Sequence, residues 1–106
     1  MTGAVYNNGK LAGYLTKNRE GQFSFSYDLA YYHDDAQPAI CLTLPKKQPV
    51  YISDHLFAFF QGLLAEGVNK DIQCRILKID ERDDFTRLLQ TAGEDTIGAI
   101  TIKPID

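Results

Sequence analysis

Apolar and polar positions alternate in three short runs within the first 27 residues of the chain. The runs cover residues 4–7, 10–17 and 22–27, and such alternation is typical of strands with one buried face and one solvated face. Between the first two runs, Asn8 and Gly9 favour a type I′ turn, because that turn needs positive φ angles at both central residues. The pattern therefore predicts a three-stranded antiparallel meander.

The following residues predict one helical turn and a fourth strand. Asp28 is suited to cap a turn within residues 28–35, since its carboxylate can accept hydrogen bonds from the first backbone N–H groups. The run between Pro38 and Pro45 alternates larger apolar residues with smaller ones, which predicts a strand. Its members are, in order, Ile40, Cys41, Leu42, Thr43 and Leu44.

A helical pattern begins after a polar connection and the short run at residues 50–52. Ser53 is a favourable N-cap, and Ile52 before it can pack on Phe57 as a hydrophobic staple. The apolar stripe of this predicted helix consists of Leu56, Phe57, Phe60, Leu63 and Leu64. The pair Glu66-Gly67 is expected to end the helix, because glycine readily takes the left-handed conformation at a C-terminus.

Two more helices and a closing strand complete the prediction. One helix is capped by Asn69 and directs Ile72, Ile76 and Ile79 inward, and the next is capped by Asp83 or Asp84. The inward residues of the latter are Phe85, Leu88, Leu89 and Ala92. Residues 96–102 are apolar and β-branched, as in a strand. The predicted fold class is α+β: an antiparallel β-sheet, with an N-terminal meander plus a C-terminal closing strand, packed with about three helices in a single domain of residues 1–106.

The charge of the chain does not alter the predicted fold, but it argues against nucleic acid as a direct ligand. The chain carries 11 basic and 14 acidic residues, a net charge of −3, which argues against direct binding of nucleic acid. Residues 1–50 have five bases and four acids, whereas residues 51–106 have six bases and ten acids. The acidic half serves solubility and, more weakly, favours a basic partner.

Cysteine content and the N-terminal sequence predict a cytoplasmic protein. Cys41 and Cys74 are the only two cysteines, fewer than a disulfide-stapled secreted domain of this length would carry. No secretory signal pattern opens the chain, and no apolar run is long enough to span a membrane. We therefore expect reduced thiols and no membrane association.

The candidate chemical groups do not form a catalytic constellation in the sequence. The run His33-Asp34-Asp35 could ligate a metal ion, but it lacks the further ligands of a zinc site, so a solvated loop is favoured. His55 is expected at the surface or near a helix cap. Cys41 in the predicted strand and Cys74 on a helix lack a positioned base, so core or boundary roles are favoured. We expect no catalytic residues, no cofactor and no metal, which favours a binding or regulatory module.

Four segments, in order and at the expected spacing, resemble the N-terminal subdomain of the HipA-type toxin serine/threonine kinases. They are YNNGKLAGYL at residues 6–15, CLTLP at 41–45, FFQGLLAEG at 59–67 and GEDTIGAITIKP at 93–104. Each motif alone is weak, but together they cover nearly the whole chain. The resemblance implies a sheet with helices packed on it, in agreement with the predicted elements.

The resemblance also implies a function. The chain ends at Asp106, where this subdomain would end, and a free-standing copy is similar to the small antitoxins of tripartite HipBST toxin–antitoxin systems. In those systems the kinase HipT lacks the subdomain, the small protein binds and neutralises it, and the helix-turn-helix protein HipB binds the operator. The expected function is thus a non-catalytic antitoxin that docks on a HipT-like kinase and meets a HipB-like protein through the complex.

Other functions stay open at this point. The chain could be a structural or co-repressor subunit of the kinase–helix-turn-helix complex without inhibiting the kinase. It could be a small enzyme that uses His33 or Cys74, or a kinase fragment with no function of its own. The sequence does not choose among inhibition mechanisms, such as blocking the kinase cleft or holding an inactive conformation.

The resemblance also suggests a partner-binding segment. Many family members read LLPEGW where this chain has Ala65 in place of proline and Val68 in place of tryptophan. A large aromatic side chain beyond a helix end could fill a partner's pocket, so the smaller Val68 spreads any anchoring role over its neighbours. The candidate partner-binding residues are Leu64, Ala65, Glu66, Gly67, Val68 and Asn69. The alternative is that this segment is only a turn between helices.

Overall fold

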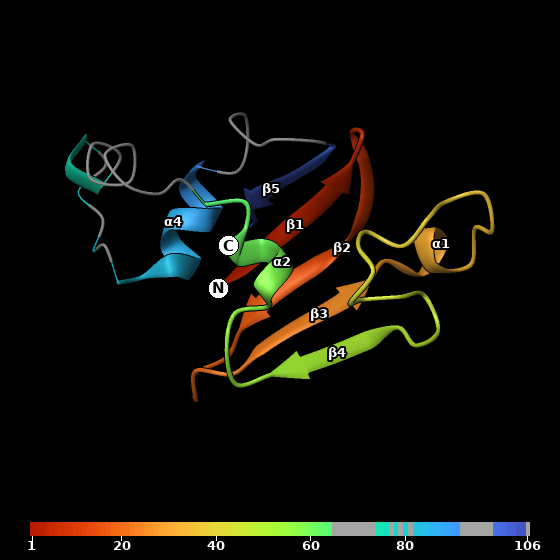
Figure 1. Cartoon of the computed structure of the whole chain (residues 1–106), viewed down its shortest axis with the longest axis horizontal. Coiled ribbons are helices and arrows are strands. Elements are labelled where there is room, and N and C mark those ends of the chain that lie inside the picture. The colour runs from red at the N-terminus through yellow and green to blue at the C-terminus, as the bar shows by residue number, and fades with distance from the viewer. Residues whose placement is uncertain (65–73, 77, 79, 81, 92–98, 106) are drawn as a thin grey trace.

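A five-stranded antiparallel sheet organises the computed structural model of the chain (Figure 1). The structure describes residues 1–64, 74–76, 78, 80, 82–91 and 99–105. The strands are β1 (Thr2–Asn7), β2 (Lys10–Lys17), β3 (Phe23–Tyr27), β4 (Val50–Ser53) and β5 (Ile100–Pro104), in the spatial order β4-β3-β2-β1-β5. The predicted α+β class is confirmed, and the closing strand β5 pairs with β1.

The N-terminal meander forms as predicted. Asn8 and Gly9 have φ angles of 52° and 80°, as the expected type I′ turn between β1 and β2 requires. Gly13 permits a close approach of β2 and β3, because a Cβ atom there would lie 2.3 Å from the carbonyl oxygen of Ser26. The same Cβ would lie 2.8 Å from the ring of Phe25, so this aromatic side chain packs over the glycine.

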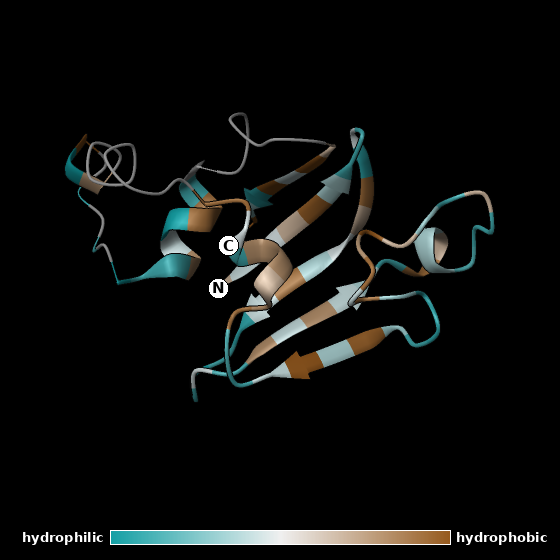
Figure 2. Cartoon of the chain, in the orientation of Figure 1, coloured by the Kyte–Doolittle hydropathy of each residue, from teal (hydrophilic) through white to brown (hydrophobic). Residues whose placement is uncertain are grey.

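The core lies between one face of the sheet and two helices. The described helices are α1 (Leu29–Tyr32), α2 (Ala58–Gln61) and α4 (Asp84–Thr91), and α2 and α4 lie over the same face (Figure 1). The fully buried side chains include Val5, Leu15, Phe25, Tyr31, Phe60, Phe85, Leu88 and Ile102. Apolar and polar residues alternate along β3 and β5 with the apolar ones buried, as a sheet with one covered face demands, whereas Val50 and Ile52 of the edge strand β4 are exposed (Figure 2). In the described part of the chain, no helix has the length and hydropathy needed to cross a membrane.

The fourth strand is present, but its predicted position is wrong. Residues 38–45 form an irregular loop, and β4 lies at residues 50–53 instead. Ile40 and Leu44 are buried as predicted, yet Leu42 is 98% exposed. The hydroxyl of Tyr27 accepts a hydrogen bond from the Ile40 N–H (3.1 Å) and donates one to the Leu44 carbonyl. A core side chain thus pairs with backbone groups that a strand would have used, and the segment curls inward.

The helix after β4 is shorter than predicted and begins later. Ser53 belongs to β4, and its Oγ accepts the His55 N–H (3.1 Å) in a tight turn rather than capping a helix. The helix α2 starts at Ala58, so the predicted cap is wrong. The predicted staple is wrong as well, because Ile52 is 69% exposed. The expected stripe still faces the core at Leu56 and Phe60, which are buried.

The last helix and strand agree with the sequence in kind. The Asp83 carboxylate accepts hydrogen bonds from the N–H (3.1 Å) and hydroxyl (2.7 Å) of Thr86 and thereby caps α4. Phe85, Leu88 and Leu89 are buried as predicted. The strand β5 runs from Ile100 to Pro104 rather than over residues 96–102. Residues 96–98, Ala92 and the predicted helix stop at residue 93 lie outside the described residues.

Of the helix expected after Asn69, residues 74–76 are described and helical, and Lys78 beyond them lies in a turn with a φ of 55°. Cys74 is buried, whereas Ile76 is 73% exposed, so the prediction that Ile76 faces inward is wrong. The helical turn at residues 74–76 therefore buries the side that carries Cys74, whereas the isoleucine spacing predicted that the side carrying Ile76 would be buried. Asn69, Ile72 and Ile79 lie outside the described residues.

Candidate functional site

The predicted partner-binding segment lies almost entirely outside the described residues. Leu64 is described: it is partly buried, packs against the core, and its N–H donates to the Gln61 carbonyl (3.1 Å). The structure does not describe Ala65, Glu66, Gly67, Val68 and Asn69. Leu64 thus starts the segment from an anchored position, and its contact with a partner stays a prediction.

The run at residues 33–35 lies just after α1 in a loop. His33 is exposed, with its ring edge-on to Tyr32 at 5.3 Å. Asp34 accepts the Ala36 N–H (3.0 Å) and lies 3.6 Å from the Lys10 ammonium. The backbone hydrogen bond from Ala36, and then the Lys10 charge, lower the pKa of this carboxyl group. No group of three His, Cys, Asp or Glu residues able to hold a metal occurs in the described part of the chain.

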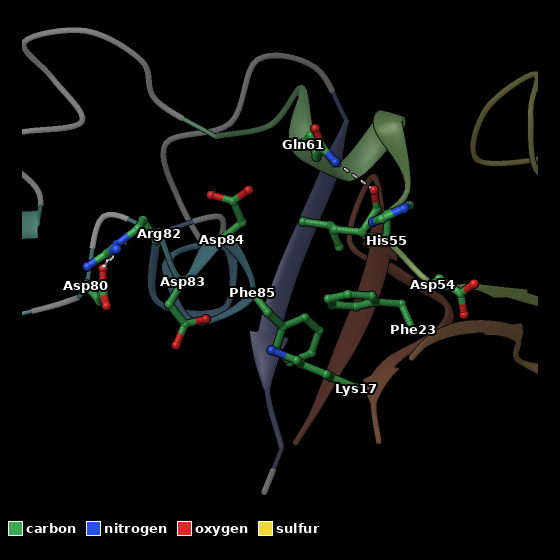
Figure 3. Close-up of a pocket in the computed structure, with 11 residues that line it drawn as sticks. Lys17, Phe23, Asp54, His55, Gln61, Asp80, Arg82, Asp83, Asp84 and Phe85 are labelled. Atoms are coloured by element: carbon green, nitrogen blue, oxygen red, sulfur yellow. Dashed lines mark hydrogen bonds and ion pairs between the residues drawn. The ribbon is translucent and has the colours of Figure 1, made fainter. Parts of the chain in front are cut away.

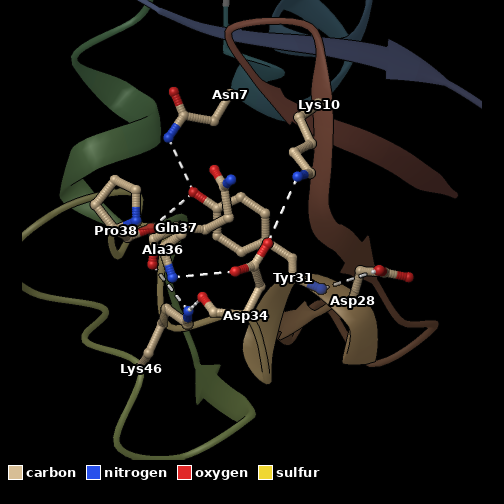
Figure 4. Close-up of polar contacts among 9 residues, drawn as sticks. All are labelled: Asn7, Lys10, Asp28, Tyr31, Asp34, Ala36, Gln37, Pro38 and Lys46. Atoms are coloured by element: carbon tan, nitrogen blue, oxygen red, sulfur yellow. Dashed lines mark hydrogen bonds and ion pairs between the residues drawn. The ribbon is translucent and has the colours of Figure 1, made fainter.

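A network of polar contacts fixes the segment from residue 28 to residue 49, which we call the loop end of the sheet (Figure 4). The Tyr31 hydroxyl donates to the Pro38 carbonyl (2.6 Å) and accepts the Asn7 side-chain amide (2.9 Å). The Lys46 ammonium donates to the carbonyls of Asp34 (2.8 Å) and Gln37 (2.9 Å). It also lies 5.3 Å from the Tyr31 ring centroid, close enough for a cation–π contact. The polar groups of the loop end therefore face one another and have a structural role.

Tyr27, Cys41 and Cys74 are the remaining described side chains considered as reactive groups. Burial raises the pKa of Tyr27 to about 12, so its hydroxyl is neutral and acts only as a hydrogen-bonding group. Cys41 lies in the loop rather than in a strand, with its sulfur 3.4 Å from the Thr43 hydroxyl. Cys74 is buried, in agreement with a core role. Both thiols are free, and neither is placed beside a histidine by the described contacts.

A pocket opens at the other end of the sheet, which we call the pocket end (Figure 3). It has a volume of about 390 Å³. Its lining residues are Lys17, Phe23, Asp54, His55, Leu56, Gln61, Asp80, Arg82, Asp83, Asp84 and Phe85. The floor is apolar, because Phe23, Leu56 and Phe85 are buried. Among the described lining residues, four carboxylates oppose two basic side chains, so this part of the pocket has an acidic rim above an apolar floor.

The polar residues of the pocket differ in how far they are already engaged. Asp83 caps α4, and Asp84 lies 3.2 Å from the Arg87 guanidinium. Asp80 has an exposed ion pair with Arg82 at 3.7 Å. Asp54 is exposed and accepts one hydrogen bond, from the Gln22 side chain at 3.3 Å. Asp54 and Asp80 are therefore the carboxylates most open to a ligand.

Sequence reasoning missed this pocket, although it marked some of its residues. It interpreted Asp83 or Asp84 as a helix cap and His55 as a surface residue; the structure confirms Asp83 as the cap and His55 as exposed, whereas Asp84 is the first residue of α4. The pocket itself is formed by the ends of β2 and β4, the beginning of β3 and the start of α4. The available signal was the excess of acids after residue 50, but the sequence did not reveal that Asp54 and Asp80 lie on one rim.

Comparison with known proteins gives the chain a family. The HipA N-terminal domain family matches residues 3–103. The chain belongs to this family. A solved structure of the N-terminal domain of HipA toxin superposes with a TM-score of 0.70 at 31% identity, covering 99% of this chain and 94% of that chain.

Two curated relatives place the domain in different contexts. A Haemophilus influenzae protein is 35% identical over 102 residues, which make up 96% of this chain and 91% of that protein. A Sinorhizobium fredii protein named "Putative kinase Y4mE" is 29% identical over 102 residues, yet these are only 24% of its length. The chain thus spans about a quarter of the kinase-named relative and nearly all of the other.

Proposed function

We propose that this chain is a non-catalytic antitoxin that binds a HipA-type serine/threonine kinase in trans and neutralises it, as a small protein of the HipS type. The observation that carries the proposal is the family match over residues 3–103. The same domain is one quarter of a kinase-named relative. A domain that is joined to a kinase in one protein can dock on such a kinase when it is a separate chain.

The described fold supports docking as a preformed unit. Its core is buried without any partner, and β5 closes the sheet against β1. Binding of two folded surfaces avoids the conformational entropy that a disordered inhibitor loses on binding. On this proposal the chain acts by occupying the kinase surface and supplies no catalytic group.

The partners follow from the same proposal. The direct partner is a HipT-like kinase, and a helix-turn-helix protein of the HipB type joins through the complex. The net charge of −3 gives the chain no electrostatic attraction to operator DNA. Any effect on repression would therefore pass through the other proteins.

We propose Leu64, Ala65, Glu66, Gly67, Val68 and Asn69 as one contact segment. Leu64 is held against the core and gives the segment a fixed starting point. Alanine substitutions at Glu66, Val68 and Asn69 are expected to weaken the complex while leaving the unfolding midpoint in place. A Val68→Trp variant tests anchoring, since a larger apolar side chain in a partner pocket should slow dissociation. Unchanged affinity in all these variants would assign the segment to a turn only.

The experiment that tests the function is co-expression of the chain with a HipA-type kinase from the same genome, scored for growth and for co-purification. Growth rescue with a stable stoichiometric complex supports the antitoxin. A complex without rescue supports the structural or co-repressor alternative, which a mobility-shift assay with the helix-turn-helix protein, with and without this chain, would then examine. If neither rescue nor a complex were observed, the chain would share the fold of the family but not the proposed function.

A further inference from the structure

The pocket and the exit of the last strand lie at the same end of the sheet. Lys17 of β2 pairs with Phe23 of β3, and Phe23 pairs with Ser53 at the end of β4. At the other edge, Pro104 at the end of β5 pairs with Gly3, and the Ile105 N–H donates to the Thr2 carbonyl at 3.1 Å. The N- and C-terminal ends of the described chain meet there (Figure 1).

This end of the domain is where a longer relative continues. The family is an N-terminal domain, so in a protein that carries more than this domain the chain proceeds after β5. In the Sinorhizobium fredii relative, about three quarters of the protein lies outside the matched segment. Met1 and Ile105, which flank the exit, are 57% and 54% exposed. A kinase that docks as it would in the linked protein therefore meets the pocket end first.

The chemistry of the pocket selects a cation. Below the rim the floor is closed, because Phe23 and Phe85 are 9% and 1% exposed and their ring centroids lie 5.6 Å apart. The Lys17 ammonium of the chain already lies 5.6 Å from the Phe23 ring centroid, so the groups that a partner can reach are the exposed carboxylates of Asp54 and Asp80. Figure 3 shows the two phenylalanine rings between Asp54 on one side and Asp80 on the other. Exposed carboxylates at the mouth of a cavity suit arginine or lysine side chains.

We propose that this pocket is a docking site for basic side chains, arginine or lysine, that one segment of the partner kinase projects into its mouth toward Asp54 and Asp80. The inference rests on the proposed function, since it identifies where the kinase binds. Asp83 and Asp84 contribute charge while they keep their bonds to Thr86 and Arg87. None of the described lining residues belongs to the proposed contact segment at residues 64–69, so the two sets of residues can be substituted independently.

The test measures the dissociation constant of the purified complex by calorimetry with a double variant, Asp54→Asn with Asp80→Asn. Asparagine keeps the size and acceptor oxygen of each side chain and removes only the charge. The matched control is Asp28→Asn with Asp35→Asn at the loop end, which changes the net charge equally. We expect the pocket variant to bind at least about tenfold more weakly and with a shallower salt dependence. The control is expected to stay within about twofold of the unmodified chain.

The outcomes separate this inference from the proposed function. If the unmodified chain binds the kinase and the pocket variant binds equally well, the pocket is not the docking site and the proposed function stands. Equal weakening of the pocket variant and the control would assign the effect to net charge and also overturn the inference. If the unmodified chain forms no complex with the kinase, the proposed function fails and the inference fails with it. Thermal unfolding of each variant verifies that the affinities refer to folded protein.

Discussion

The two ends of the sheet use similar polar residues for different purposes. At the loop end, the hydroxyls of Tyr27 and Tyr31 and the ammonium of Lys46 bond to backbone carbonyls of the same chain. At the pocket end, the carboxylates of Asp54 and Asp80 surround a cavity, and their only described partners are exposed side chains and a local turn. Polar groups that are satisfied inside the fold stabilise it, whereas polar groups that open onto a cavity can recognise another molecule.

At the pocket end, the floor and the rim of the pocket also differ from each other. Phe85 forms part of the floor and is 1% exposed, so the floor belongs to the hydrophobic core. The rim above it carries charge. Substitutions at the floor should therefore change stability, and conservative substitutions at the rim should change binding.

The largest expected effect is on the floor of the pocket. Phe85→Ala removes a buried ring that contacts Phe23, and we expect the free energy of unfolding to fall by about 3–5 kcal/mol. Urea unfolding followed by circular dichroism measures this change. Asp54→Asn is the control on the rim and should change the unfolding free energy by less than about 0.5 kcal/mol. Equal effects at both positions would contradict the division into floor and rim.

The next effect is at the loop end. Tyr27→Phe removes the hydroxyl that joins Ile40 and Leu44, leaving a buried N–H and a buried carbonyl without that partner. We expect a loss of about 1–3 kcal/mol in unfolding free energy. Tyr51→Phe, which loses one bond to the Pro45 carbonyl, is expected to lose less. Kinase affinity of the folded Tyr27→Phe protein should be unchanged, and a large drop in that affinity would move binding to the loop end.

The same hydroxyl predicts a pH dependence in alkaline solution. The pKa of Tyr27 is about 12 in the fold and near its ordinary value of 10.0 when unfolded. Between these values the unfolded chain loses the proton while the folded chain keeps it, so stability falls as pH rises from about 10 to about 12. Unfolding midpoints measured across this range should fall less steeply for Tyr27→Phe than for the unmodified chain. Identical slopes would show that Tyr27 ionises alike in both states.

The smallest expected effect concerns the Lys46 ammonium. Lys46→Met keeps much of the aliphatic stem and removes the bonds to the Asp34 and Gln37 carbonyls, for a loss of about 1 kcal/mol. Lys47→Met changes the net charge equally at an exposed neighbour and should stay within about 0.5 kcal/mol of the unmodified protein. Thermal unfolding distinguishes the two variants, and equal behaviour would mean that the Lys46 bonds do not stabilise the loop.

The sequence predicts the parts of the fold that local chemistry determines. Asn8 and Gly9 specify their turn through the φ angles that they accept, and Asp28 and Asp83 cap helices through their own carboxylates. The inward positions of α4 follow from helical spacing at Phe85 and Leu88. In each case the determining contact lies within four residues along the chain.

The errors arise where a distant residue determines the backbone. Residues 38–45 alternate as a strand would, but Tyr27 binds their backbone groups across at least 13 residues of sequence. Ser53 has the properties of a helix cap, yet pairing with Phe23 draws it into β4. The pocket was missed for the same reason, because Asp54 and Asp80 come to line one pocket only when α4 packs on the sheet. The partner segment at Leu64 came from family resemblance and is still untested.

Neutralisation of a kinase by binding can be measured by titrating the purified chain into a purified HipA-type kinase from the same genome and following phosphoryl transfer. We expect the rate of phosphoryl transfer to fall in proportion to added chain and to reach its minimum at one chain per kinase. The double Asp54→Asn, Asp80→Asn variant should require a higher concentration for the same inhibition. A phosphorylation rate that stays constant at a tenfold molar excess of the folded chain would contradict the proposed neutralisation.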